Sequence, residues 1–135
     1  MRTINSICLI DDDPITIFSV KKLIEITQIS ETVNCFRNGQ EALEFFNTTD
    51  PQIHPELILL DLNMPIVDGW EFMDAYHTLN LNNDIIIYVM TSSINPSDAK
   101  KVIAYNQKFN FEVRHLIKPI NKDKLITLAK EYTSS

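Results

Sequence analysis

The side chains of this sequence that could do chemistry together are carboxylates, one hydroxyl and one ammonium group: Asp11, Asp12, Asp13, Asp61, Thr91 and Lys118. Adjacent carboxylates such as Asp11 and Asp12 repel each other unless a cation lies between them. Mg²⁺ suits that role, because it needs only one or two carboxylates plus waters and phosphate oxygens. Asp61 could then attack phosphorus as a carboxylate nucleophile, while Thr91 and Lys118 stabilise the oxygens of the transferred group.

A charge count favours a divalent cation in this group. Asp11, Asp12 and Asp61 contribute −3 when ionised and Lys118 contributes +1, so an Mg²⁺ ion would leave the group neutral. Mn²⁺ could take the same place. Ordinary explanations also stand, because Asp11 and Asp12 could form a solvated acidic turn and threonine is common in strands. Asp61 has the greatest need of a partner, since it follows the apolar run "LILL" and a buried charge is costly when unpaired.

Five short apolar runs predict the strands that position these side chains, at residues 4–10, 32–36, 56–62, 85–91 and 113–118. Several runs are apolar at consecutive positions, which is typical of parallel strands buried on both faces. Amphipathic patterns predict the helices, at residues 14–27, 40–46, 70–79, 96–106 and 122–132. This regular alternation predicts a right-handed doubly wound α/β sheet, with residues 47–55 as a long surface loop.

The candidate side chains follow the carboxyl ends of predicted strands, which is where ligands bind in such sheets. In chain order, the first, third, fourth and fifth strands lead into Asp11 to Asp13, Asp61, Thr91 and Lys118. Pro14 suits the first turn of a helix, so Asp13 is predicted to be the N-cap of that helix. The pair Asp68 and Gly69 is interpreted as turn chemistry. The remaining candidates are expected to converge on one edge of the sheet.

Composition limits the chain to a few classes. A chain of 135 residues with 44% apolar and 22% charged residues predicts one globular domain over residues 1–135. The net charge of −6 disfavours nucleic-acid binding. No charge-free apolar stretch approaches the roughly 18 residues of a membrane span, so a cytoplasmic protein without membrane contact is expected. Cys8 and Cys35 are predicted to be reduced core thiols, Phe18 a core or helix-packing residue, and His54 a surface residue.

Four motifs occur together in this sequence: "LIDDDP" at 9–14, "LILLDLNMPIVDGWEF" at 57–72, "VMTSS" at 89–93 and "LIKPI" at 116–120. In this order and at these spacings the chain resembles the receiver domains of bacterial two-component response regulators over essentially its whole length. The resemblance implies a flavodoxin-like (βα)5 fold with a five-stranded parallel sheet in the order 2-1-3-4-5. It also implies a phosphoryl donor, which would be a histidine kinase or a histidine phosphotransfer protein.

Carried over residue by residue, the resemblance implies that Asp61 is the phosphoacceptor. It implies that Mg²⁺ is held by three carboxylates and one backbone carbonyl, those of Asp11, Asp12, Asp61 and Asn63. Thr91 and Lys118 would contact the phosphoryl oxygens. Asn63 and Ser93, two positions past Asp61 and Thr91, are where the resemblance suggests that the lifetime of the phosphoryl group is tuned.

The implied switch consists of Thr91 and an aromatic residue on the fifth strand. On phosphorylation these would change the surface made by the fourth helix, the fifth strand and the fifth helix. The fifth-strand position is His115 here, where the family usually has Tyr or Phe, so the coupling to the output surface is left open. Ser92 replaces the usual Ala or Gly and is small enough to admit a phosphoryl group. Family members also tend to have a cis bond at the position of Lys118 and Pro119.

Two other function classes remain open. The stretch "DDDPI" at 11–15 superficially resembles the first motif of haloacid-dehalogenase phosphatases, with Asp11 as nucleophile, although the usual cap and late acidic pair are missing. The departure at His115 also leaves open an adaptor that binds its partner regardless of phosphate. In the leading interpretation the chain is no enzyme beyond its own phosphorylation and dephosphorylation. It would be a monomer or a phosphorylation-dependent dimer with a downstream protein target.

Overall fold

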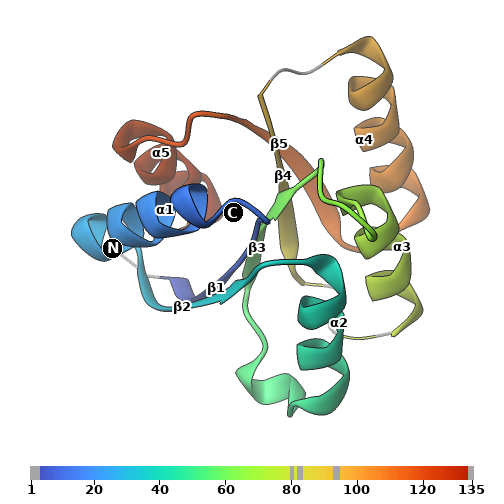
Figure 1. Ribbon diagram of the computed structural model, residues 1–135, viewed down its shortest axis with the longest axis horizontal. Coiled ribbons are helices and arrows are strands. Elements are labelled where there is room, and N and C mark those ends of the chain that lie inside the picture. The colour runs from blue at the N-terminus through green and yellow to red at the C-terminus, as the bar shows by residue number, and fades with distance from the viewer. Residues whose placement is uncertain (1–3, 80, 82–83, 93–94, 134–135) are drawn as a thin grey trace.

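The computed structural model describes residues 4–79, 81, 84–92 and 95–133, and strands and helices alternate along this part of the chain (Figure 1). The strands are β1 (Ile4–Ile10), β2 (Ser30–Phe36), β3 (Leu57–Asp61), β4 (Ile86–Thr91) and β5 (Glu112–Ile117). The helices are α1 (Pro14–Thr27), α2 (Gly39–Thr48), α3 (Gly69–Thr78), α4 (Pro96–Lys108) and α5 (Lys122–Thr133). A short 3₁₀ turn, η1 (Pro51–Ile53), precedes β3. None of the described helices is both long enough and apolar enough to cross a membrane.

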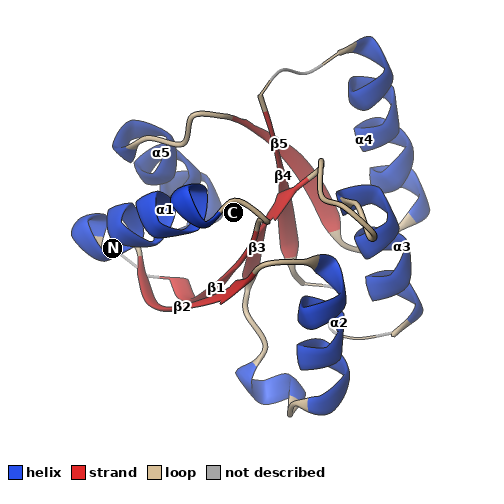
Figure 2. Ribbon diagram, in the orientation of Figure 1, coloured by secondary structure: helices blue, strands red, loops and turns tan. Residues whose placement is uncertain are grey.

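The strands form one parallel sheet in the order β2-β1-β3-β4-β5, which confirms the predicted fold. Helices α1 and α5 cover one face, and α2, α3 and α4 cover the other (Figure 2). The chain moves from β1 outward to β2 and then returns to β3 on the other side of β1. The topological switch point therefore lies between the carboxyl ends of β1 and β3, where a ligand site is expected.

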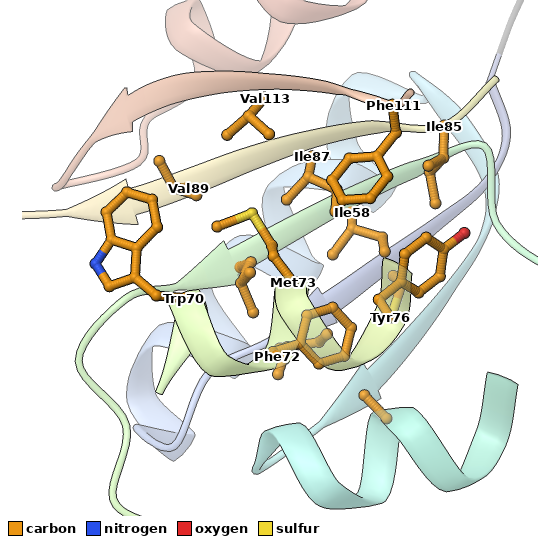
Figure 3. Close-up of a cluster of buried hydrophobic side chains, with 14 of the residues drawn as sticks. Ile58, Trp70, Phe72, Met73, Tyr76, Ile85, Ile87, Val89, Phe111 and Val113 are labelled. Carbon is orange, nitrogen blue, oxygen red and sulfur yellow. The ribbon is translucent and has the colours of Figure 1, made fainter. Parts of the chain in front are cut away.

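Strand β3 is buried on both faces, as its run of apolar residues predicts. Leu57 and Leu59 pack into the core under α1 and α5, whereas Ile58 and Leu60 pack into the core under α2, α3 and α4. Figure 3 shows Ile58 in this second core, among side chains of α3. All four side chains are fully buried, and each such burial stabilises the fold by about 1.5–3 kcal/mol. The strand therefore holds its last residue, Asp61, in a fixed position.

The boundaries of the strands and helices lie within two residues of the predicted ones. Helix α1 spans residues 14–27 as predicted, and its N-cap is Asp13, whose Oδ1 accepts the N–H of Ile15 at 3.0 Å. The interpretation of residues 47–55 as a loop is partly wrong, since α2 continues to Thr48 and η1 follows it. The segment nevertheless stays largely at the surface, since η1 has no buried residue.

The predictions for Phe18 and His54 are wrong. Phe18 is 72% exposed, because α1 turns Val20 toward the core and a residue two positions away lies about 200° around the helix. His54 is half-buried, since η1 returns the chain to the end of α2. Its ring centroid lies 5.1 Å from that of Phe46, and its Nε2 lies 3.0 Å from the hydroxyl oxygen of Thr49.

Candidate functional site

The carboxyl ends of β1, β3, β4 and β5 bring the predicted side chains together at one edge of the sheet. The Nζ of Lys118 donates to Oδ2 of Asp11 at 3.0 Å and lies 3.5 Å from Oδ1 of Asp61. One carboxylate oxygen from each of Asp11, Asp12 and Asp61 lies within 4.8 Å of the other two. The N–H of Lys118 donates to the carbonyl of Thr91 at 2.7 Å, which joins the ends of β4 and β5.

Two of the three carboxylates are deeply buried. Asp11 is 0% exposed and Asp61 is 4% exposed, whereas Asp12 is open to solvent. The Oδ1 of Asp11 accepts the N–H of Asp13 at 2.9 Å, and the Oδ1 of Asp61 accepts the N–H of Asn63 at 3.2 Å. These bonds and the nearby ammonium offset part of the cost of burying the charges. A carboxylate is tolerated at the end of the apolar strand β3 because the N–H of Asn63 and the ammonium group of Lys118 lie beside it.

The electrostatics of the site separate the roles of its charged groups. Burial, and after it the charge of Asp11, raises the pKa of Asp61 to about 6, although the N–H of Asn63 and the charge of Lys118 oppose this. Burial lowers the pKa of Lys118, but its hydrogen bond to Asp11 and the charges of both aspartates outweigh that effect and raise it. Lys118 is therefore a fixed cation at neutral pH, and Asp61 is the group whose charge changes nearby.

The acidic cluster has the composition of a site for a hard divalent cation. Asp11, Asp12 and Asp61 contribute −3 and Lys118 contributes +1, so the net charge of −2 matches one divalent ion. After burial, the second cause of the raised pKa of Asp61 is the charge of Asp11, a repulsion that a bound cation would relieve. Asn63, the predicted backbone ligand, follows β3 by two residues, and its N–H already contacts Asp61. The residues present fit Mg²⁺.

The loop after β3 holds α3 against the acidic cluster. A Cβ on Gly69 would lie 2.8 Å from the carbonyl oxygen of Asp61, so this close approach requires glycine. Asp68 is the N-cap of α3 in a capping box with Glu71, which agrees with its interpretation as turn chemistry. Ile66 has a φ of 70°, a left-handed conformation that is costly for a β-branched residue, and it is 89% exposed.

His115 lies away from the acidic cluster, in the middle of β5 and opposite Val89 of β4. It is half-buried and lines a cavity of about 340 Å³ between β5 and α5. Its Nε2 is buried and has no hydrogen-bond partner among the described residues. Ser92 is exposed and lines a different cavity together with Lys118. Ser93, the second position predicted to tune the phosphoryl lifetime, lies outside the described residues.

Lys124 of α5 is a residue that the sequence interpretation missed. Its Nζ donates to the carbonyl oxygens of Ile117 at 2.6 Å and Pro119 at 2.9 Å, which lie on either side of Lys118. The peptide bond between Lys118 and Pro119 is cis, as the family resemblance implies. A lysine in the first turn of a helix interacts unfavourably with the helix dipole, and this unusual position was the one sequence feature that could have drawn attention to Lys124. Lys122 carries the same signal, so the sequence alone does not distinguish the two.

Comparisons with known proteins agree on one family. The family model of the response regulator receiver domain matches residues 7–130. The fold superposes on a two-component response regulator from Cytophaga hutchinsonii with a TM-score of 0.83 and 28% identity, covering 99% of this chain and 100% of that one. A response regulator from Legionella pneumophila gives a TM-score of 0.76 and 28% identity, with coverage of 97% and 99%. The nitrate/nitrite response regulator protein NarL of Escherichia coli (strain K12) is 34% identical over 87 residues, which are 64% of this chain and only 38% of NarL.

Proposed function

Because the chain belongs to the response regulator receiver domain family, we propose that it is a phosphorylation-dependent switch whose phosphoacceptor is Asp61. The donor is the phosphohistidine of a histidine kinase or of a histidine phosphotransfer protein. The chemistry of the chain is limited to its own phosphorylation and dephosphorylation. Its output is a changed surface that a downstream protein recognises.

The observation that carries this proposal is a nearly buried carboxylate beside a fixed ammonium group. The Nζ of Lys118 lies 3.5 Å from Oδ1 of Asp61, and the N–H of Asn63 donates to the same oxygen. Attack through Oδ2 therefore breaks neither contact. As the oxygen–phosphorus bond forms, the phosphorus–nitrogen bond to the donor imidazole breaks, and its electron pair stays on the ring nitrogen. The product is an aspartyl phosphate.

The chain's own residues supply charge and orientation for this step. The ammonium group of Lys118 would stabilise the negative charge of the phosphoryl oxygens. The backbone N–H of Lys118 donates to the carbonyl of Thr91, so the end of β4, with the hydroxyl of Thr91, lies next to Lys118. A divalent cation held by the carboxylates of Asp11, Asp12 and Asp61 and by the carbonyl of Asn63 would neutralise the remaining charge and stabilise the phosphoryl oxygens. Since the pKa of Asp61 is raised to about 6, its carboxylate is mostly ionised and able to attack at pH 7.

The direct test uses acetyl phosphate as a small-molecule donor in the presence of Mg²⁺, with intact mass as the measurement. The wild type is expected to gain one phosphoryl group, and Asp61→Asn none. Asp50→Asn is a matched control, because Asp50 is exposed and the one described hydrogen bond of its side chain, from the N–H of Gln52, suits an amide oxygen equally well. An unmodified wild type, or an equal gain on Asp61→Asn, would refute the proposal.

The proposed output surface consists of α4, β5 and α5, reported through Thr91 and His115. The buried Nε2 of His115 has no hydrogen-bond partner among the described residues, so the ring can move without breaking a bond to that atom. Amide chemical shifts on these three elements are expected to change when the wild type is phosphorylated and to stay constant in Asp61→Asn. Size-exclusion chromatography of the same samples distinguishes a constant monomer from a phosphorylation-dependent dimer.

The same samples discriminate the two other function classes. An adaptor would bind its partner with equal affinity as Asp61→Ala and as phosphorylated wild type. A haloacid-dehalogenase phosphatase would turn over a phosphomonoester and lose this activity in Asp11→Asn. The geometry disfavours the phosphatase, because Asp11 is fully buried and both of its oxygens already accept hydrogen bonds, from Asp13 and Lys118.

A further inference from the structure

The side chain of Lys124 crosses from α5 to the end of β5. Its ammonium group donates to the carbonyl oxygen of Ile117 at 2.6 Å and to that of Pro119 at 2.9 Å. The backbone of Lys124 is fixed in turn, because its N–H donates to Oδ1 of Asn121 at 2.9 Å. A single cation on a capped helix therefore binds the chain on both sides of Lys118.

These contacts complete a set of restraints on Lys118. Its own N–H donates to the carbonyl of Thr91 at 2.7 Å, so the backbone is held from β4 as well as from α5. From this position its side chain contacts Asp11 at 3.0 Å and Asp61 at 3.5 Å. Displacement of a catalytic group by about 1 Å can cost on the order of a hundredfold in rate. The contacts of Lys124 therefore lie where small movements matter.

The location of Lys124 on its helix supports a specific role. A positive charge in the first turn of a helix is disfavoured by the helix dipole, and the two carbonyl oxygens supply the negative partial charge that offsets this. Lys122 lies in the same turn but is exposed, so it is a natural reference for the charge alone. The two lysines differ in their contacts and not in their charge.

We propose that Lys124 is a positioning residue that holds Lys118 in place for phosphoryl transfer to Asp61. The part of this inference that concerns transfer rests on the proposed function of Asp61. The part that concerns the backbone of Lys118 does not, because it follows from the hydrogen bonds alone. The two parts are measured separately below.

The experiment compares the wild type with Lys124→Met, Lys124→Arg and Lys122→Met. The first readout is hydrogen exchange of the Lys118 amide, measured by NMR without phosphodonor. The second is the rate of phosphorylation by acetyl phosphate and Mg²⁺ as a function of acetyl phosphate concentration. Lys124→Met is expected to accelerate exchange of the Lys118 amide and to lower the maximal rate on the order of tenfold, with a smaller change in the half-saturating concentration.

The controls decide between positioning and a general effect. Lys124→Arg keeps a cation with several donors, so both readouts are expected to recover most of the way to wild type. Lys122→Met removes the same charge and is expected to leave both unchanged. Equal effects of Lys122→Met and Lys124→Met, or a wild-type amide exchange rate in Lys124→Met, would overturn the inference. If Lys124→Met does not fold, Lys124→Gln is measured in its place, with a rate and an amide exchange equal to those of wild type as the contrary result.

The two readouts distinguish a failure of the proposed function from a failure of the positioning role of Lys124. If the wild type is not phosphorylated at all, the proposed function fails, and the amide exchange still decides whether Lys124 restrains Lys118. If phosphorylation occurs but does not respond to Lys124→Met, the proposed function stands and the positioning role is refuted.

Discussion

Replacement of Asp61 by asparagine is expected to stabilise the protein when no divalent cation is present. Asp61 is 4% exposed, and burial together with the charge of Asp11 raises the pKa of its carboxyl group from 3.8 to about 6. Between about pH 4 and pH 6 the folded state binds a proton that the unfolded state has already lost. The free energy of unfolding contributed by this group therefore falls as pH rises through that window and stays low above it.

The size of the effect follows from the pKa. At about 1.4 kcal/mol for each pH unit between the two pKa values, the full loss is about 3 kcal/mol above pH 7 and about half of that at pH 5. Asparagine does not ionise, so the free energy of unfolding of Asp61→Asn does not decrease in this way as pH rises. The variant does lose the attraction between Asp61 and Lys118. We expect the free energy of unfolding of Asp61→Asn to be higher than that of the wild type by about 2–3 kcal/mol at pH 7.5 and by about 1–1.5 kcal/mol at pH 5.

Urea unfolding in the presence of a chelator, at several values of pH between 5 and 8, measures this difference. Asp50→Asn serves again as the control, because its carboxylate is exposed, and a change within about 0.5 kcal/mol is expected. Mg²⁺ is expected to stabilise the wild type more than Asp61→Asn, since it relieves the repulsion that the variant lacks. The reasoning is refuted if Asp61→Asn is no more stable than wild type at pH 7.5, or if its advantage does not shrink toward pH 5.

Three further perturbations test the geometry. Lys118→Met leaves the buried carboxylates of Asp11 and Asp61 without their cation, so urea unfolding in chelator is expected to show a loss of about 3 kcal/mol or more, partly recovered by Mg²⁺. A loss that Mg²⁺ does not reduce would contradict the charge count. Gly69→Ala places a Cβ 2.8 Å from the carbonyl oxygen of Asp61 and is expected to cost about 1–3 kcal/mol and to slow phosphorylation, measured by urea unfolding and by intact mass over time. Wild-type values of both would show that the loop yields freely. Ile66→Gly removes a β-branched residue from a φ of 70° and is expected to raise the free energy of unfolding by about 1 kcal/mol, and a decrease would show that no strain is stored there.

The candidate site could be predicted from the sequence because its residues occupy equivalent positions. Asp11, Asp61, Thr91 and Lys118 each end or follow a predicted strand, and the carboxyl ends of parallel strands share one edge of the sheet. The convergence of their side chains therefore needed only the alternation of strands and helices. Lys118 and Asp11 are 107 residues apart in the sequence, yet the pattern of elements still predicted that they share this edge.

Two kinds of feature could not be predicted. Phe18 was predicted to be buried but is exposed. Helix α1 carries apolar residues around much of its circumference, and periodicity alone does not determine which face packs against the sheet. The partial burial of His54 depends on the path of η1 across the end of α2. This path brings His54 into contact with Phe46 and Thr49, and no local sequence pattern predicts such a contact. Both depend on the direction in which an element meets its neighbours.

The sequence by itself determined the number and order of the elements, the buried course of β3, and the set of charged residues at one edge, since each of these depends on local residue pattern and on the rules of parallel sheets. Only the tertiary structure decided which charges are paired, how far Asp61 is buried, and that Lys124 spans from α5 to the chain around Lys118. The physical reason is that pairing and burial depend on distances of a few ångströms between separate elements. Such distances are set by the packing of the whole domain, and no local pattern encodes them.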